Sequence, residues 1–401
     1  MSQTTNILSK VPGLVALLLL GSAARDELSF LEYSNGTVEL FSDYEFMTVT
    51  SAQLSQAQRQ TLGTQLEALE RKIANPNPLF HIDVIYRERQ RLATMPPIIF
   101  TFELKQNARV LYGEDLRSEI PDVTLENLDF RNTNEILYKR LWAILLYLPK
   151  RFILGKMSEA ERRVAGYVLC RNALDLTTVL LPHEGILLPT YRQRVERLAS
   201  AYPALSLTDR FGPELPRFLE DCLAQRLSLD FAAIDLSAWY ARTIRYLELA
   251  LSYVSPKDRP IDQTLPTHSR VVFNEWPISQ GEWYNLARLT ASLLRRQGPL
   301  MAYRWLRRPK KGWLTVGLLA MHKALVAWQR GDAAQAEQWL RQSEETLRQI
   351  ALSNVSTPGR SFLERWLALR KQWGDFWREY IRLGDPKYRQ RFENIMEWQH
   401  D

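Results

Sequence analysis

"LVALLLLGSAARDE", residues 14–27, decides the fold, because it supports two incompatible interpretations. An apolar core followed by small residues is typical of the end of a secretory signal peptide. Alternatively, the apolar run at 15–20 is a strand buried on both faces that leads into a turn at Gly21. Only Lys10 supplies a basic start for a signal peptide, and cleavage after Ala24 would discard that turn. The sequence downstream favours the folded strand.

The first part of the chain, to about residue 115, alternates short apolar runs with helical patterns. Strands are predicted at 15–20, 43–50, 79–86, 98–104 and 110–113. Asn35 and Gly36 lie between two alternating runs within 30–41, which predicts a tight hairpin. A polar helix is predicted at 51–73. This order of elements predicts an α+β domain with a small mixed sheet and flanking helices.

After about residue 120 the strand patterns stop, and a mostly α-helical region is predicted. Helices are predicted at 124–149, 158–181, 189–201, 213–227 and 233–254, and again from about 280 to the end. A Pro-rich stretch after residue 255 predicts an extended linker. We therefore expect an α+β domain at 1–118, a helical domain at 119–256, a linker at 257–278 and a basic, Trp-rich helical region at 279–401.

Composition excludes several classes of protein. The 401 residues suggest two or three domains, and two cysteines without a CxxC or histidine partner exclude a disulfide framework or a zinc finger. No apolar run reaches the roughly 18 residues of a membrane helix, so no transmembrane segment is expected. There is no P-loop, and the five histidines form no catalytic motif. We expect a cytoplasmic protein.

The net charge of +7 is concentrated in one segment. Residues 283–331 hold ten Lys or Arg and no Asp or Glu, so the rest of the chain is acidic. An anionic partner at residues 288–323 would explain this clustering, and so would a solvated helical face whose acidic neighbours lie elsewhere in the fold. The sequence leaves both explanations open.

A candidate site combines two pieces of sequence. The first is Gly21 and Ser22 at the end of the buried strand, and the second is Asp43 and Glu45 in "DYEF". Because strand side chains alternate, the two carboxylates point to the same face, where their repulsion calls for a cation. Mg²⁺ suits carboxylate and phosphate oxygens. Gly21 allows backbone to approach a phosphate, and Ser22 adds a hydroxyl at a predicted helix start.

"LGS" followed by "DYEF" resembles the nucleotidyltransferase superfamily, which includes the DNA polymerase β-like enzymes. Small bacterial and archaeal members with a helical C-terminal region often have Gly-Ser, two small residues, Arg, Gly and Glu. Here "GSAARDE" agrees except that Asp26 replaces the glycine. The resemblance covers residues 10–115, about a quarter of the chain.

The resemblance implies an enzyme that moves a nucleoside monophosphate from a nucleoside triphosphate to a hydroxyl acceptor and releases pyrophosphate. Asp43 and Glu45 would hold two Mg²⁺ ions together with a third carboxylate, which would also act as general base. Asp83 in "HIDVIY" is the first candidate for that carboxylate, and Glu103 is the second. The acceptor is open: a small molecule, a protein or an RNA.

Two further points stay open. Arg25 either contacts phosphate or forms an ion pair with Glu27 or Asp26. The helical domain at 119–256 would form the acceptor side of the cleft, as in aminoglycoside nucleotidyltransferases. The alternative function is a catalytically inactive nucleotidyltransferase fold that binds nucleotide or nucleic acid or acts as a scaffold. Asp26 and the undecided third carboxylate both leave room for it.

Overall fold

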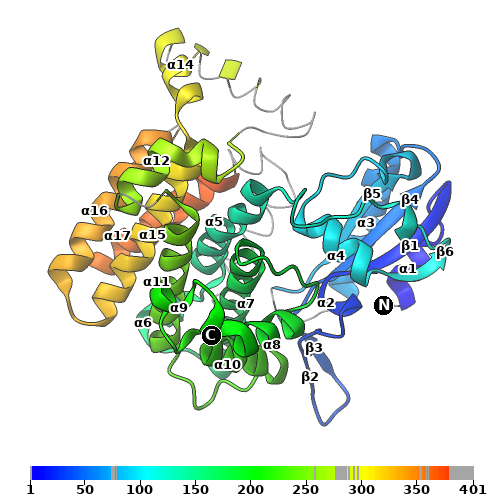
Figure 1. The fold of residues 1–401 in the computed structure, drawn as a ribbon, viewed down its shortest axis with the longest axis horizontal. Coiled ribbons are helices and arrows are strands. Elements are labelled where there is room, and N and C mark those ends of the chain that lie inside the picture. Colours follow the sequence, from blue (N-terminus) through cyan, green and yellow to red (C-terminus); the bar gives the residue numbers. More distant parts are fainter. Residues whose placement is uncertain are drawn as a thin grey trace. The chain divides into compact units, whose positions relative to one another are not determined.

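A computed structural model gives the fold of the chain in two compact units (Figure 1). It describes residues 2–73, 77, 79–256, 259–275, 287, 290–291, 294–295, 298–351, 355–357, 359 and 361–378. Unit 1 comprises Met1–Asp129 and Leu180–Phe231, and unit 2 comprises Phe130–Val179 and Ala232–Asp401. These units do not follow the boundaries predicted near residues 118, 256 and 278, because each unit is built from two separate stretches of chain.

Unit 1 contains a four-stranded mixed sheet in the order β5-β4-β1-β6 (Figure 1). Its strands are β1 (Leu14–Leu20), β4 (Tyr44–Thr50), β5 (Ile82–Glu88) and β6 (Arg109–Gly113). β1 runs antiparallel to β4 and β6, whereas β4 and β5 are parallel. The predicted fold class is therefore confirmed: a small mixed sheet with flanking helices precedes a mostly helical region.

The central strand β1 is buried on both faces, as its unbroken apolar run predicts. Leu17 and Leu19 pack with α1 (Ser2–Leu8) and α3 (Gln56–Ile73) on one face of the sheet. Leu18 and Leu20 pack on the other face with residues that include Leu104 of α4 (Ile99–Asn107). Strand β1 therefore stands between two apolar layers, and its last residue leads directly into the candidate site.

The segment at 98–104 corrects the sequence prediction, because it is helix α4 rather than a strand. A short apolar run cannot be assigned to helix or strand by periodicity alone. Pro96 and Pro97 lie just before the helix. The Oγ1 of Thr101, in the first turn of α4, donates a hydrogen bond to the carbonyl of Pro96. The helix covers the face of the sheet that carries the candidate carboxylates, which places Glu103 near them.

The hairpin at Asn35-Gly36 is confirmed. It joins β2 (Phe30–Glu32) and β3 (Val38–Leu40) in a separate two-stranded sheet. The remaining described helices of unit 1 have between 4 and 14 residues. They are α2 (Gly21–Ala24), α8 (Tyr191–Ala201), α9 (Thr208–Phe211) and α10 (Leu215–Ser228), with 3₁₀ turns at Arg89–Arg91, Arg117–Glu119 and Tyr202–Ala204.

Unit 2 is helical. Its helices are α5 (Phe130–Tyr147), α6 (Lys150–Leu154), α11 (Leu236–Val254), α12 (Ile261–Val272), α14 (Pro299–Arg307), α15 (Lys310–Gln329), α16 (Ala333–Ile350) and α17 (Phe362–Phe376). α15 packs against α5, α11, α12 and α16, so it is the centre of this unit (Figure 1). The Nε1 of Trp366 donates to the carbonyl of Met321, which fixes α17 on α15.

The predicted extended linker at 257–278 is also corrected. Helix α12 occupies Ile261–Val272 and buries Leu265 and Val272. It starts directly after Pro260 and tolerates Pro266 in its second turn. Proline at the N-cap, as at Pro260, is compatible with a helix, and α12 also accommodates Pro266 in its interior, so proline content misled the prediction.

One helix among the described residues, α7 (Glu159–His183), is long and apolar enough to cross a membrane. The boundary between the two units falls within it. Of its most apolar window, 94% is buried inside the protein, as in the core helix of a folded domain.

Candidate functional site

At the turn after β1, the backbone of Gly21 lies against the carboxylate of Glu45. Gly21 has φ +64°, and a Cβ at this position would collide with the side-chain carboxylate of Glu45 on the neighbouring strand. Leu20 and Glu45 are partners in the antiparallel register. Glycine is therefore required here for two reasons, its positive φ and the close approach of Glu45.

The predicted carboxylates lie at one edge of the sheet. Glu45 is the parallel register partner of Asp83, and Asp43 precedes Glu45 by two residues. Side chains alternate along a strand, so Glu45 and Asp83 share the face that carries Met47 and Ile85 and is covered by α4, whereas Asp43 directly precedes β4. Asp43 is 9% exposed and Asp83 is 42% exposed. The structure thus brings Gly21 and the three predicted acids to one edge of the sheet.

A histidine that the sequence analysis passed over lies between two of these acids. The Nδ1 of His81 is 2.7 Å from Oδ1 of Asp43, and its Nε2 is 2.8 Å from Oδ2 of Asp83. Burial acts to lower the pKa of His81, but the neighbouring carboxylates outweigh burial and raise the pKa from 6.5 to about 10. One signal was present in the sequence, because His81 precedes Asp83 by two residues and so shares its face.

The chemistry of these donors suits Mg²⁺, because carboxylate oxygens are its preferred protein ligands. Among the described residues, however, no three His, Cys, Asp or Glu side chains are grouped so that they could hold a metal ion. Asp43 and Glu45 have the donor type that Mg²⁺ prefers. Asp43 and Asp83 each have one carboxylate oxygen turned to His81.

A small cavity of about 30 Å³ lies beside the turn, with room for about two water molecules. It is bounded by Gly21, Arg25 and Glu45 on the sheet side and by Glu103 and Asn107 of α4. Apolar residues complete the lining: Leu20, Ala24, Phe100, Leu104 and Ala108.

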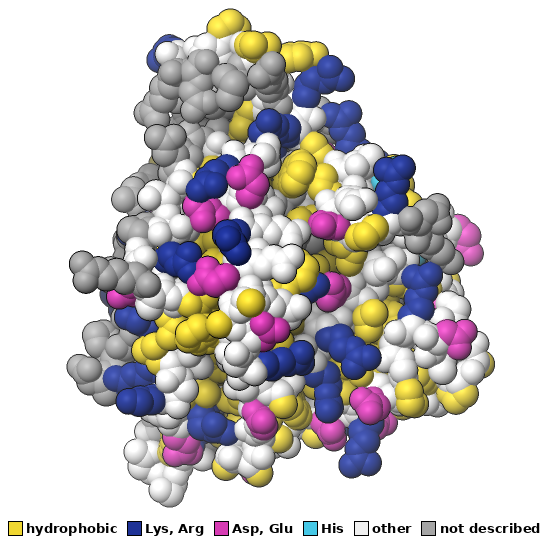
Figure 2. Space-filling model, turned by 90° about the vertical axis from the view of Figure 1, so that its left-hand side faces the viewer, with side chains coloured by type: hydrophobic (Ala, Val, Ile, Leu, Met, Phe, Trp, Pro, Cys, Tyr) yellow, Lys and Arg dark blue, Asp and Glu magenta, His cyan; other side chains and the backbone are white. Residues whose placement is uncertain are grey.

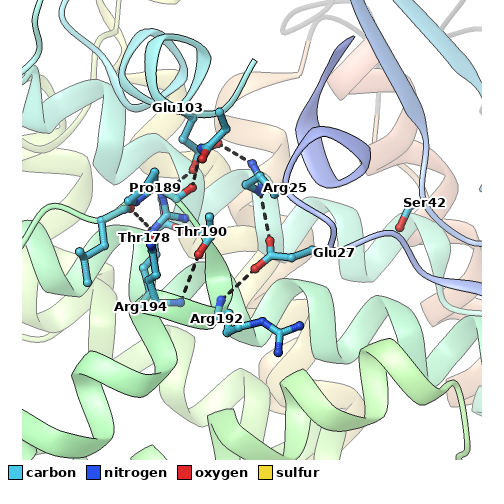
Figure 3. A network of polar contacts seen from close by, with 12 residues as sticks. Arg25, Glu27, Ser42, Glu103, Thr178, Pro189, Thr190, Arg192 and Arg194 are labelled. Atoms are coloured by element: carbon cyan, nitrogen blue, oxygen red, sulfur yellow. Dashed lines mark hydrogen bonds and ion pairs between the residues drawn. The ribbon is translucent and has the colours of Figure 1, made fainter. Parts of the chain in front are cut away.

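Arg25 belongs to a buried ion network rather than to a free phosphate-binding position (Figure 3). Its Nε is 3.1 Å from Oε2 of Glu27, and its Nη1 is 2.9 Å from Oε2 of Glu103. The other oxygen of Glu103 accepts from Nη2 of Arg194 at 2.5 Å. This geometry favours the ion-pair interpretation of Arg25, with Glu103 as its second partner.

Glu27 ties the same turn to the helices of unit 1. Its Oε1 accepts from the backbone N–H of Arg192 at 2.9 Å, at the start of α8 (Figure 3). Its carbonyl accepts from Nη1 of Arg226 of α10 at 2.9 Å. The ring of Tyr191 has the guanidinium groups of Arg25, Arg194 and Arg226 within 5.4 to 5.8 Å of its centroid. These contacts fix the chain directly after the Gly21 turn.

Ser22 and Asp26 complete the turn. Ser22 lies in α2, so a helix does start at this turn, but it is only four residues long. The carbonyl of Ser22 accepts from the N–H of Glu27 at 2.9 Å. Asp26 has φ +57° and pairs with Arg109 of β6. The glycine expected at this position is replaced, yet the positive φ that favours glycine is kept.

The basic segment uses several of its charges within unit 2. Lys310 is 3% exposed and donates to the carbonyls of Trp305 and Arg308, and burial lowers its pKa to about 7. Lys311 pairs with Glu135, and Lys323 pairs with Glu248.

On the face drawn in Figure 2, Lys and Arg side chains are interspersed with Asp and Glu side chains. Arg288 and Arg296 lie outside the described residues. The ion pairs of Lys311 and Lys323 match the explanation that acidic neighbours lie elsewhere in the fold, whereas Lys310 is buried rather than solvated; an anionic partner stays a prediction.

No protein-family model matches the chain, and no curated protein matches it. Among solved structures, the chain is similar to spectinomycin adenyltransferase AAD(9) from Enterococcus faecialis, solved with ATP and spectinomycin. The match has 13% identity and a TM-score of 0.33, and it covers 61% of this chain and 99% of the other. A similarity of this size does not establish a shared activity.

Proposed function

We propose that unit 1 transfers a nucleoside monophosphate from a nucleoside triphosphate to a hydroxyl acceptor, with release of pyrophosphate. The observation that carries this proposal is the position of Gly21 against Glu45, with Asp83 beside Glu45 on the same face of the mixed sheet and Asp43 directly before β4. A turn that exposes backbone beside a carboxylate suits a nucleotide whose phosphates are bridged by a cation.

The proposed role of each residue follows from its position. Gly21 and Ser22 would receive the triphosphate, because the turn lacks a side chain at Gly21 and carries a hydroxyl at Ser22. Asp43 and Glu45 would hold Mg²⁺, which when bound neutralises charge on the phosphates. The second ion implied by the family resemblance would also need Asp83, one oxygen of which faces His81.

The reaction can be written with balanced bonds. The acceptor oxygen attacks the α-phosphorus and forms a new P–O bond, while the bond between the α-phosphorus and the bridging oxygen breaks. Pyrophosphate leaves with that electron pair. The acceptor proton passes to the carboxylate of Asp83, which is 42% exposed and thus accessible to an acceptor.

The test is pyrophosphate release. The full-length protein is incubated with each labelled nucleoside triphosphate, Mg²⁺ and cell extract as a source of acceptors. We expect release and labelling with at least one nucleotide, and loss of both in a variant that combines Asp43→Asn and Glu45→Gln. Asp115→Asn, an acid of unit 1 that is 49% exposed, is the matched control. A folded protein that releases no pyrophosphate with any nucleotide contradicts the proposal.

A second candidate function is favoured by the position of His81, whose ring nitrogens face carboxylate oxygens of Asp43 and Asp83. In this case the fold binds nucleotide or nucleic acid without transferring anything. Binding of a nucleoside triphosphate with no pyrophosphate release and no labelled acceptor would favour it. Equal binding by wild type and the Asp43/Glu45 variant would argue that the carboxylates serve no nucleotide at all.

A further inference from the structure

Glu27, which follows the Gly21 turn, connects that turn with two helices of unit 1. Its side chain is 1% exposed. One carboxylate oxygen accepts from Nε of Arg25 at 3.1 Å, and the other accepts from the backbone N–H of Arg192 at 2.9 Å (Figure 3). The carbonyl of Glu27 accepts from Nη1 of Arg226 at 2.9 Å. A single residue therefore binds the turn to the start of α8 and to α10.

The contact with α8 is a helix cap supplied by a distant part of the chain. The first N–H groups of a helix have no partner within the helix. Thr190 is the N-cap residue and accepts from the N–H of Gln193, while Glu27 accepts from the N–H of Arg192. The partial positive charge at a helix start favours a carboxylate there. Helix α8 and the turn therefore stabilise each other.

Buried charges surround this contact. Arg194 and Arg226 are 3% and 2% exposed. Arg194 donates to Glu103 and to the carbonyl of Leu188, so it also holds the chain just before α8. Removing one member of a buried ion network leaves its partners charged and uncompensated. We therefore expect the turn to keep its conformation only while α8 and α10 are docked on it.

We propose that Glu27 is a positioning residue through which α8 and α10 control the affinity of the Gly21–Ser22 turn for a triphosphate. This inference rests on the proposed nucleotide site, in which Glu27 acts on the turn rather than on the substrate. The carbonyl of Ser22 accepts from the N–H of Glu27 at 2.9 Å, so a displaced Glu27 displaces Ser22. The contacts that exert this control span 165 and 199 residues of sequence.

The experiment measures the turn and the nucleotide separately in the full-length protein. Hydrogen exchange follows the amides of residues 21–27 and those of β4. Calorimetric titration with Mg²⁺ and the α,β-methylene analogues of ATP, GTP, CTP and UTP gives the nucleotide Kd. Glu27→Gln removes the charge, and Arg226→Met removes the donor on α10. We expect both variants to speed exchange at 21–27 and to raise Kd by at least about tenfold, as for the loss of one hydrogen bond that involves a charged group.

Two controls separate positioning from a general loss of stability. Leu8→Ala removes a fully buried side chain that precedes β1, whereas the turn follows the end of that strand. It should destabilise unit 1 and keep the wild-type Kd under conditions in which circular dichroism shows every variant to be folded. Arg226→Lys keeps a charged donor and should bind nucleotide more tightly than Arg226→Met. If Glu27→Gln does not fold, the two Arg226 variants decide.

The outcomes distinguish this proposal from the transfer reaction. Weaker binding in Glu27→Gln and Arg226→Met, but not in Leu8→Ala, supports it whether or not the wild type releases pyrophosphate. Unchanged affinity in the first two variants overturns it and leaves the transfer reaction standing. An equal loss in Leu8→Ala, or equal acceleration of exchange in the turn and in β4, does the same. A wild type that binds none of the four analogues overturns both proposals.

Discussion

At the scale of single residues, Gly21 is the most constrained position of the site. An L-amino acid at its positive φ costs about 1–2 kcal/mol, and a Cβ would also displace the carboxylate of Glu45. We expect Gly21→Ala to lower the opening free energy of β1 and β4 amides, measured by hydrogen exchange, by more than the backbone cost alone.

Gly36 provides the matched control. It has φ +79° in the hairpin turn, and a Cβ there would meet nothing within 4 Å. Gly36→Ala should therefore show only the backbone cost of about 1–2 kcal/mol, confined to the β2–β3 hairpin. Equal losses for the two variants would mean that Glu45 moves aside without cost.

Asp26 shows that a glycine pattern can be broken while its conformation is retained. Its φ of +57° is tolerated by Asp better than by most residues, and its ion pair with Arg109 is 78% exposed on the Asp26 side. We expect Asp26→Gly to change the free energy of unfolding by less than about 0.5 kcal/mol, since relief of strain offsets the lost surface pair. Asp26→Val should cost about 1–2 kcal/mol in urea denaturation. Similar values for the two variants would contradict this account.

At the scale of elements, the sequence predicts those structural features that depend on residues close together in the chain. The apolar run of β1 and the Asn35-Gly36 hairpin are local patterns, and the structure contains both of them. Helix α4 was missed because its short apolar run has no period that separates helix from strand.

The ion network was beyond sequence reasoning for a different reason. Arg25 and its partner Glu103 are 78 residues apart, and Arg226 and Glu27 are 199 residues apart. Such pairs form only when the fold brings distant elements together, and a single sequence carries no record of them. The same holds for His81, whose contacts with Asp43 and Asp83 depend on the parallel register of β4 and β5.

The network should contribute measurably to the stability of unit 1. Glu103 holds two arginines, Arg25 and Arg194, whose side chains are 9% and 3% exposed. Glu103→Gln would leave both guanidinium groups without that charge, and we expect a loss of about 2–4 kcal/mol in urea denaturation, discounted for the partial exposure of Glu103. Glu114→Gln, which removes a 57% exposed partner of Arg89, should cost at most about 1 kcal/mol. Equal costs would mean that the network is energetically neutral.

At the scale of the whole molecule, the two units can be observed separately. All twelve tryptophans lie at residue 142 or later and within the two stretches of unit 2. Tryptophan fluorescence therefore reports unfolding of unit 2, while hydrogen exchange of the sheet reports unit 1. Measurements that give different midpoints would establish that the units unfold independently.

Because fluorescence reports on unit 2 alone, the contribution of the buried His322 to the stability of unit 2 can be tested. His322 is fully buried, with Nδ1 2.8 Å from the hydroxyl of Tyr240 and Nε2 2.8 Å from the carbonyl of Leu141. Burial lowers the pKa of His322 from 6.5 to about 4, and the nearby Arg370 adds to the effect. The unfolded chain thus binds a proton more readily than the folded one, so stability is complete above pH 6.5 and falls as the pH drops toward 4.

We expect fluorescence-detected urea denaturation to show that unit 2 loses up to roughly 3 kcal/mol over this pH range on account of His322. His322→Gln lacks the titrating group, so its stability should be lower at neutral pH but should fall less steeply between pH 6.5 and 4. His268→Gln, which changes a partly exposed histidine of α12, should keep the wild-type slope. If the slopes of wild type and His322→Gln coincide, other groups account for the acid sensitivity of unit 2, and the imidazole is not kept neutral by its burial.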